Sequence, residues 1–367
     1  MFLSSRFSAL SDSRKRLILL SLLTVYLGGS CGLLQATRYR APKPYADIML
    51  QASEQLNTAF GAIKDLRLSL GHPIDKLDDP NETGMIGDLL TDITTTHGIL
   101  EAKRSAANPN SAAMVTDLLI RCGVKEGDYV ACNFSSSFPT LDLATVCALD
   151  SIGAHGIIIN SVGASTYGAN LPDLTYLDME QELLGKGLIR NHAEWFSLGG
   201  AGDVGTGMPE QVTEEIVRRA RSHGLSYIHE PDLSANLEIR KEIYAAVPEK
   251  PVCFINVGGN LLSFAGAEEK LTATDGIVTE VRSSSEPQGL IPYFFRRGTP
   301  VIHLLNMKTL MPANGLPYDP LPLPAVGEGD VYSELRYDRK IAGLLGAGFV
   351  ILSFLCFRIF PRRQIPL

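Results

Sequence analysis

Apolar and polar residues alternate in blocks along the middle of the chain, and each block predicts a strand, a loop or a helix. The clearest stretch is residues 129–165, YVACNFSSSFPTLDLATVCALDSIGAHGIIINSVGAS. Its apolar runs at 129–134 and 156–160 are rich in β-forming residues, as is typical of strands covered on both faces. Between them, apolar side chains recur at helical spacing at Leu141, Ala144, Cys147 and Ala148. The stretch therefore predicts one βαβ unit.

The same rhythm continues through the central region. An apolar stripe predicts an amphipathic helix at 45–70. Further strands are predicted at 193–198, 225–228, 252–257 and 299–305, and further helices at 111–121, 179–189, 210–223 and 234–247. Strands that alternate with helices and end in Gly, Ser or Asn indicate an α/β fold with a doubly wound, mostly parallel sheet and flanking helices.

Two runs without charge, 17–34 and 341–357, lie near the ends of the chain. The first has 18 residues, just enough to cross a bilayer. With their flanks, the runs predict transmembrane helices at 17–37 and 341–360. A buried glycine-rich helix is the alternative for each run. A signal peptide is a further alternative for the first, because basic residues precede it.

Basic residues beside the two runs favour both termini in the cytoplasm and the middle of the chain outside, in the cell (inner) membrane. The predicted organisation is then a basic N-terminus at 1–16, a first span, an extracytoplasmic α/β domain at 41–305, a proline-rich tether at 306–338 and a second span.

Composition and charge exclude several classes of protein. The 367 residues carry a formal net charge of −7 and no basic cluster, which argues against a nucleic-acid partner. The cysteines lack a CxxC motif, and no two histidines have metal-ligand spacing. The acidic loop at 72–87 lacks the spacing of an EF-hand, so a solvated turn is favoured there. We therefore predict no metal site and no cofactor.

Glycine and serine loops follow the predicted strands, and they are the candidate site. In an open parallel sheet, ligands collect at the carboxyl ends of the strands, where helix N-termini present N–H groups to anions. We expect the loops at 135–137, 162–166, 199–207 and 258–260 to converge there on an anionic ligand. The alternative is that each loop merely caps a helix and faces solvent separately.

A polar segment at 92–110 adds charged candidates. Lys103 and Arg104 would suit a carboxylate or phosphate ligand, although a charged helix face is the alternative. The residues predicted to bind substrate are Glu101, Lys103, Arg104, Ser161, Gly163, Ser165, Gly200, Gly202, Gly258, Gly259 and Asn260. The residues predicted to be catalytic, if a reaction occurs, are Ser135, Ser136, Ser137 and Asp203.

Two motif-based alternatives remain open. The run 200–205 is a literal G-x-G-x-x-G, but Asp203 would place a negative charge beside a pyrophosphate and Pro209 delays the next helix. No G-x-S-x-G occurs, so a hydrolase would have to pair one of the serines at 135–137 with Asp203 and a histidine such as His97 or His229.

Five runs, at 93–110, 133–144, 161–170, 197–207 and 256–262, together resemble the bacterial family called poly-gamma-glutamate system protein. The resemblance covers nearly the whole chain, including both terminal runs. It implies a membrane location and, as partners, the poly-γ-glutamate ligase, its membrane subunits and the γ-glutamyl polymer. It assigns no residue a catalytic role.

Three functions are therefore expected from the sequence. The first is a membrane-anchored accessory protein of poly-γ-glutamate synthesis or export with a carboxylate-binding cleft. The second is an extracytoplasmic serine-dependent hydrolase or transferase that acts on that polymer. The third is a nucleotide-binding α/β domain.

Overall fold

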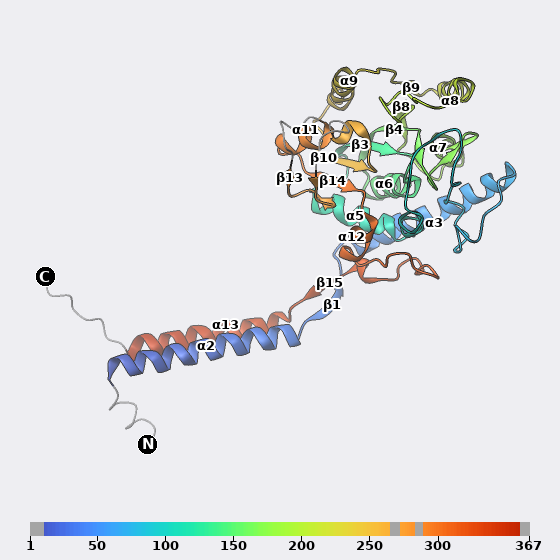
Figure 1. Cartoon of the computed structure of the whole chain (residues 1–367). Helices are drawn as coiled ribbons and strands as arrows, with labels where there is room; N and C mark the ends of the chain where they lie inside the picture. The colour runs from blue at the N-terminus through green and yellow to red at the C-terminus, as the bar shows by residue number, and fades with distance from the viewer. Residues whose placement is uncertain (1–10, 265–271, 283–288, 360–367) are drawn as a thin grey trace. The chain divides into compact units, whose positions relative to one another are not determined.

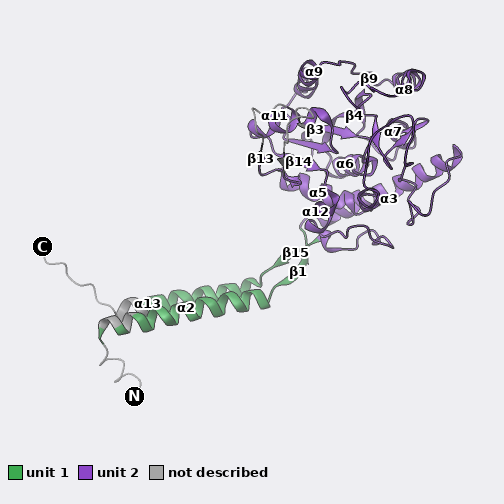
Figure 2. Ribbon diagram, in the orientation of Figure 1, with its two compact units in different colours: residues 1–43, 333–367 green, residues 44–332 purple. Residues whose placement is uncertain are grey.

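The computed structural model describes residues 11–264, 272–282 and 289–359. The chain divides into two compact units (Figure 2). Unit 1 comprises Met1–Lys43 and Ser333–Leu367, and unit 2 comprises Pro44–Tyr332. The predicted basic N-terminus therefore lies largely outside the described residues, as does Phe360 at the end of the second predicted span.

Unit 1 is a helical hairpin followed by a short strand pair. Helices α2 (Asp12–Ala36) and α13 (Arg339–Ile359) lie side by side (Figure 1). Strands β1 (Tyr39–Pro42) and β15 (Ser333–Arg336) pair antiparallel. The Tyr26 hydroxyl donates a hydrogen bond to the Leu345 carbonyl at 2.6 Å, which satisfies a polar group inside an otherwise apolar pair of helices.

One helix in the described part of the chain, Leu17–Ala36, is long and apolar enough to cross a membrane. Its position near the N-terminus is also typical of a signal sequence. The second apolar run is helical in α13, but the described residues do not support it as a second span.

Unit 2 is a mixed α/β unit around a seven-stranded sheet, with strand order β12-β14-β10-β3-β4-β8-β9 (Figure 1). All neighbours are parallel except β12, which pairs antiparallel at one edge. The prediction of a mostly parallel sheet is confirmed. The strands are β3 (Tyr129–Ser135), β4 (His155–Ser161), β8 (Ala193–Ser197), β9 (Ser226–Tyr227), β10 (Cys253–Val257), β12 (Gly276–Ile277) and β14 (Val301–Leu304).

Helices cover both faces of this sheet because the buried strands alternate their apolar side chains between two cores. Val130 and Cys132 of β3 point into one core, which also contains side chains of α3, α5 and α6. Ala131, between them, belongs to a second core together with Leu237 of α9 and Phe294 of α11. A strand buried on both faces is apolar at successive positions, which is the pattern seen in the sequence.

The helices of unit 2 follow most of the predicted ranges. They are α3 (Ala46–Ser69), α4 (Leu100–Ala106), α5 (Ser111–Arg121), α6 (Pro139–Ile152), α7 (Tyr176–Gly185), α8 (Glu210–Ser222), α9 (Leu233–Ala245), α10 (Leu261–Phe264), α11 (Leu290–Arg296), α12 (Met307–Ala313) and the 3-10 turn η1 (Asp330–Tyr332). Short pairs are β2 (Thr94–Thr96) with β5 (Ala164–Ser165), β6 (Asn170–Leu171) with β7 (Leu174–Thr175), and β11 (Thr272–Ala273) with β13 (Val281–Arg282).

The prediction of a tether over 306–338 is wrong for most of its length. Residues up to Tyr332 belong to unit 2, and α12 lies in this segment. Asp319 forms an ion pair with Arg104 at 2.6 Å, and the buried Tyr332 hydroxyl donates to Ser53. Proline kept the segment from forming long regular elements, but its side chains still pack against the rest of the unit.

Candidate functional site

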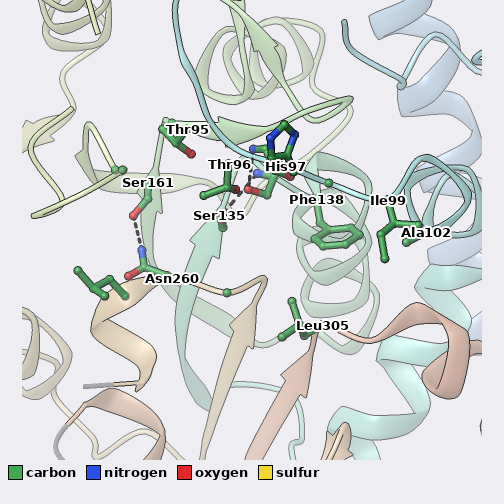
Figure 3. A pocket seen from close by; sticks show the side chains of 18 of the residues that line it. Thr95, Thr96, His97, Ile99, Ala102, Ser135, Phe138, Ser161, Asn260 and Leu305 are labelled. Carbon is green, nitrogen blue, oxygen red and sulfur yellow. Dashed lines mark hydrogen bonds between the residues drawn. The ribbon is translucent and has the colours of Figure 1, made fainter. Parts of the chain in front are cut away.

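A cavity of about 860 Å³ opens at the carboxyl ends of the sheet strands (Figure 3). Each of five neighbouring strands supplies a lining residue at or just after its last position. These residues are Ser135 after β3, Ser161 after β4, Gly199 after β8, Gly259 after β10 and Leu305 after β14. The four loops expected to converge do line this one cavity.

The order of the strands explains the position of the cavity. The chain moves outward from β3 through β4 and β8 to β9, and then returns to the other side of β3 with β10. The connections therefore leave β3 and β10 in opposite directions. A crevice forms at such a reversal, and ligands of open α/β sheets bind there.

The wall of the cavity above the sheet comes from the polar segment at 92–110. Strand β2 pairs in parallel with β5, which matches Thr94 with Ala164 and Thr96 with Ser165. This pairing places Thr95, His97 and the following helix α4 beside the serine loops (Figure 3). The segment is thus a wall of the site, and its density of polar residues was the sequence signal for that.

Lys103 is the most unusual lining residue, because its side chain is only 3% exposed. Its Nζ donates hydrogen bonds to the Ser137 carbonyl and to Ser165 Oγ, the latter at 2.8 Å. It also lies 3.9 Å from the centre of the Phe138 ring. A carbonyl, a hydroxyl and an aromatic face therefore surround the three N–H bonds of the ammonium.

Burial lowers the pKa of Lys103 from 10.5 to about 7, and the charge of Asp142 opposes this shift. Asp142 is itself fully buried, and burial raises the pKa of its carboxyl well above the usual 3.8, as does the neighbouring charge of Glu180. Because the pKa of Lys103 is about 7, its amine is present in both protonation states near neutral pH.

Asp203 has a structural role and is not the predicted acid or base. Its carboxylate, 2% exposed, pairs with the fully buried guanidinium of Arg240 at 2.6 Å. It also accepts hydrogen bonds from Ser197 Oγ, Ser161 Oγ and Asn236 Nδ2, at 2.8, 3.2 and 3.1 Å. These partners use the lone pairs of both oxygens, so we assign Asp203 to anchoring the glycine loop rather than to proton transfer.

A row of buried polar side chains continues this network across the sheet. Arg240 donates to Asn133 Oδ1 at 2.7 Å, and Asn133 donates to Asn256 Oδ1 at 2.9 Å. Asn256 contacts His303 Nδ1 at 3.1 Å on the next strand. Burial lowers the pKa of His303 from 6.5 to about 4, so this ring is neutral at neutral pH. The row crosses the sheet beneath the cavity, close to the strand ends that line it.

The literal G-x-G-x-x-G run does not take the form of a dinucleotide loop. It folds back on itself, with the Gly205 amide donating to the Gly199 carbonyl at 2.8 Å. Helix α8 begins only at Glu210, whereas the third glycine of the fingerprint stands where the helix opens. The nucleotide alternative therefore lacks its structural context.

Most of the predicted site residues lie together. The cavity is lined by Ser135, Ser137, Asp203, Lys103, Ser161, Gly163, Ser165, Gly200, Gly202, Gly259 and Asn260. Asn260 donates a hydrogen bond to Ser161 Oγ at 2.6 Å (Figure 3). Lys103 donates to Ser165 Oγ.

Four predicted residues do not line the cavity. Ser136 is buried and donates to Asn160 Oδ1 at 3.1 Å, and Glu101 is exposed elsewhere. Arg104 binds Asp319 through two hydrogen bonds of 2.6 and 2.7 Å, so its guanidinium is engaged within the fold. Gly258 packs against Ser135, and a Cβ at 258 would stand 2.9 Å from Ser135 Cβ.

The sequence reasoning missed lining residues that follow the last strand. Leu305, Asn306, Met307 and Lys308 come directly after β14 and close one side of the cavity, and Tyr318 lies nearby. The carboxyl-end rule would have found them, since the strand at 299–305 was predicted. The proline-rich composition that follows had instead suggested a segment outside the domain.

The charges of the lining residues favour an anionic ligand. Lys103 and the exposed Lys308 contribute amines, and His97 lies at the exposed rim. Asp203 is the one carboxylate among the lining residues that the structure describes, and the ion pair with Arg240 balances its charge. Among the described lining residues, an anion entering the cavity therefore meets basic groups and no unbalanced carboxylate.

Comparison of the chain with protein-family models, with curated proteins and with solved structures finds no match.

Proposed function

We propose that this protein is a membrane-anchored component of a poly-γ-glutamate synthesis or export system, and that its cavity binds the polymer through the free carboxylates. The observation that carries the proposal is the charge of the cavity: its described lining contains Lys103 and Lys308 and no unbalanced acid. The family resemblance of the sequence supplies the identity of the ligand.

A γ-glutamyl chain fits this lining because its peptide links run through the side chain and leave one free carboxylate on every residue. Lys308 stands exposed at the cavity wall, where it can meet such a carboxylate without being desolvated first. A hydrogen bond between charged groups contributes about 1.5–3 kcal/mol. Serine hydroxyls and glycine backbone elsewhere in the lining suit the amide links between residues.

The membrane location rests on unit 1. Leu17–Ala36 supplies one helix of sufficient length and apolar character. In the proposal α13 is the second span, the termini are cytoplasmic and unit 2 is extracytoplasmic in the cell membrane, beside the ligase and its membrane subunits. The close packing of the two helices supports this, because a Cβ at Gly348 would stand 2.3 Å from the Tyr26 hydroxyl oxygen.

The test is calorimetric binding of oligo-γ-glutamate to the full-length protein in detergent micelles. Lys308→Ala is expected to weaken binding about tenfold, which corresponds to loss of one charge-assisted contact of roughly 1.4 kcal/mol. Lys250→Ala, which removes an exposed lysine that does not line the cavity, is the matched control. Absence of binding by the wild-type protein, or equal losses in the two variants, would refute the proposal.

A further inference from the structure

We propose that Ser165 and Lys103 are a nucleophile and its general base, and that the cavity cleaves or transfers an acyl group at an amide of the bound ligand. This inference rests on the proposed function for the identity of the substrate, a γ-glutamyl amide. It goes further by assigning a reaction and by moving the nucleophile away from the serines at 135–137.

Ser165 has the position that a nucleophile needs. It lines the cavity, and its Oγ lies 2.8 Å from Lys103 Nζ, within the reach required for proton transfer. Its backbone amide donates to Ser137 Oγ at 3.0 Å, and β5, where it sits, is paired with β2. These contacts hold the backbone of Ser165 against the lysine before any substrate arrives.

Lys103 has the environment that a lysine base needs. A lysine acts as a base only when its amine is neutral, and burial favours the neutral form. The charged amine donates to both Ser165 Oγ and the Ser137 carbonyl. The neutral amine can still donate to that carbonyl while its lone pair accepts the Ser165 proton. Both protonation states are therefore satisfied in the same geometry.

The other serines that line the cavity differ from Ser165. Ser161 donates to Asp203, whose carboxylate is already engaged by the ion pair with Arg240. In the described part of the chain, the hydroxyls of Ser135 and Ser137 accept hydrogen bonds from backbone amides, of Ser137 and Ser165 respectively. Ser136 is buried outside the cavity. His229, a base candidate from the sequence, contacts the Tyr227 hydroxyl and does not line the cavity.

The reaction balances without a cofactor. Ser165 Oγ attacks the amide carbonyl carbon, and its proton passes to Lys103 Nζ. The C–N bond then breaks, and the leaving amine takes that proton from Lys103, which leaves an ester on Ser165. Water attacks the ester, Lys103 accepts one of its protons and returns it to Ser165 Oγ, and the carboxylic acid is released. If a second amine attacks in place of water, the acyl group is transferred and a new amide forms.

Gly98 packs directly against this pair. A Cβ at position 98 would stand 2.7 Å from the Thr166 carbonyl oxygen, 2.9 Å from Ser165 Oγ and 3.0 Å from Lys103 Cε. Alanine at this position would therefore clash with the backbone next to Ser165 as well as with the two side chains, so the close packing requires glycine.

The experiment uses the full-length protein in detergent micelles and two substrates. Oligo-γ-glutamate reports turnover, measured as released amine, and p-nitrophenyl acetate reports acylation, located by peptide mass mapping. The acetyl group is expected on Ser165. Ser165→Ala, Lys103→Met and Lys103→Arg are each expected to lower both rates at least about 100-fold, and Ser136→Ala is expected to leave them unchanged.

The pH profile separates a base from a structural lysine. The wild-type acylation rate is expected to rise as pH passes about 7, where Lys103 becomes neutral. Asp142 from α6 faces this amine, Glu101 and Arg104 share its helix, and His97, Asp203 and Lys308 line the same cavity. His97→Gln should keep the profile, and Lys103→Arg should lose it even though its positive charge is retained.

The outcomes separate the two proposals. Acylation of Ser165 by the ester without binding of the oligomer would retain the catalytic pair and overturn the proposed ligand. Binding of the oligomer without acylation or turnover would retain the binding function and overturn the catalytic pair. Acetylation of Lys103 in place of Ser165, or wild-type rates in Ser165→Ala, would also overturn the catalytic pair.

Discussion

Substitution of Arg240 by methionine tests the network beneath the cavity most directly. The Arg240 guanidinium is fully buried and donates to four side chains. Two of these hydrogen bonds are short, at 2.6 Å to Asp203 and 2.7 Å to Asn133. The other two run to Ser197 at 2.9 Å and Asn236 at 3.2 Å. Methionine fills a similar volume but leaves the Asp203 carboxylate without its cation.

The expected loss in the free energy of unfolding is about 3–5 kcal/mol, because removal of one partner leaves a buried, uncompensated charge. The matched control is Arg218→Met. Arg218 also pairs with a carboxylate at 2.6 Å, that of Glu215, but both side chains are about half exposed or more, at 68% and 49%. An exposed pair of this kind contributes about 0–1 kcal/mol. The two ion pairs have the same distance but differ in burial, so the difference between the two losses in stability measures the effect of desolvation.

Urea unfolding of the full chain in detergent measures both losses at neutral pH. The single tryptophan, Trp195, lies on β8 and packs against the core that contains Leu237, so its fluorescence reports on this region. The double variant Asp203→Asn with Arg240→Met should lose less than the sum of the two single variants, since neither charge is then left alone. If Arg240→Met costs no more than Arg218→Met, the network does not hold the unit together as argued.

Three further predictions concern protonation, glycine and topology. Because the pKa of Lys103 is about 7 in the folded chain and 10.5 in the unfolded chain, the unfolded chain binds one more proton between these pH values. The free energy of unfolding should therefore rise with pH across that window, by up to about 1.4 kcal/mol per pH unit. A Lys103→Met variant with the same slope would contradict this. Gly61→Ala, inside α3 with open space around it, should stabilise by about 0.5–1 kcal/mol. Gly87→Ala should destabilise, since its Cβ would overlap the Gly168 carbonyl oxygen, and thermal unfolding midpoints that move together would refute the steric argument. For topology, Lys250→Cys in a Cys31→Ser background should react with a membrane-impermeant maleimide in spheroplasts; labelling only after lysis would place unit 2 in the cytoplasm.

The sequence by itself determined the main elements of unit 2 and the edge of the sheet at which the site forms. Strands β3 and β4 and helix α3 were predicted within about two residues, because each carries a complete local pattern of apolar positions. The convergence of the loops after β3, β4, β8 and β10 followed from one rule: parallel strands share their carboxyl edge. The apolar helix Leu17–Ala36 was predictable for the same reason, since length and composition suffice.

Only the tertiary structure decided which side chains pair. Lys103 and Arg104 are adjacent and equally basic, yet Lys103 turns to Ser165 in the cavity and Arg104 to Asp319, 215 residues along the chain. The sequence shows that Asp203 has a carboxylate but not what that carboxylate binds. Its ion pair with Arg240 from α9 makes it an anchor. Apolar periodicity fixes which face of an element is buried, but it says nothing about which distant polar group will stand opposite. That depends on how the elements pack, and packing sets the burial that shifts the pKa of Lys103.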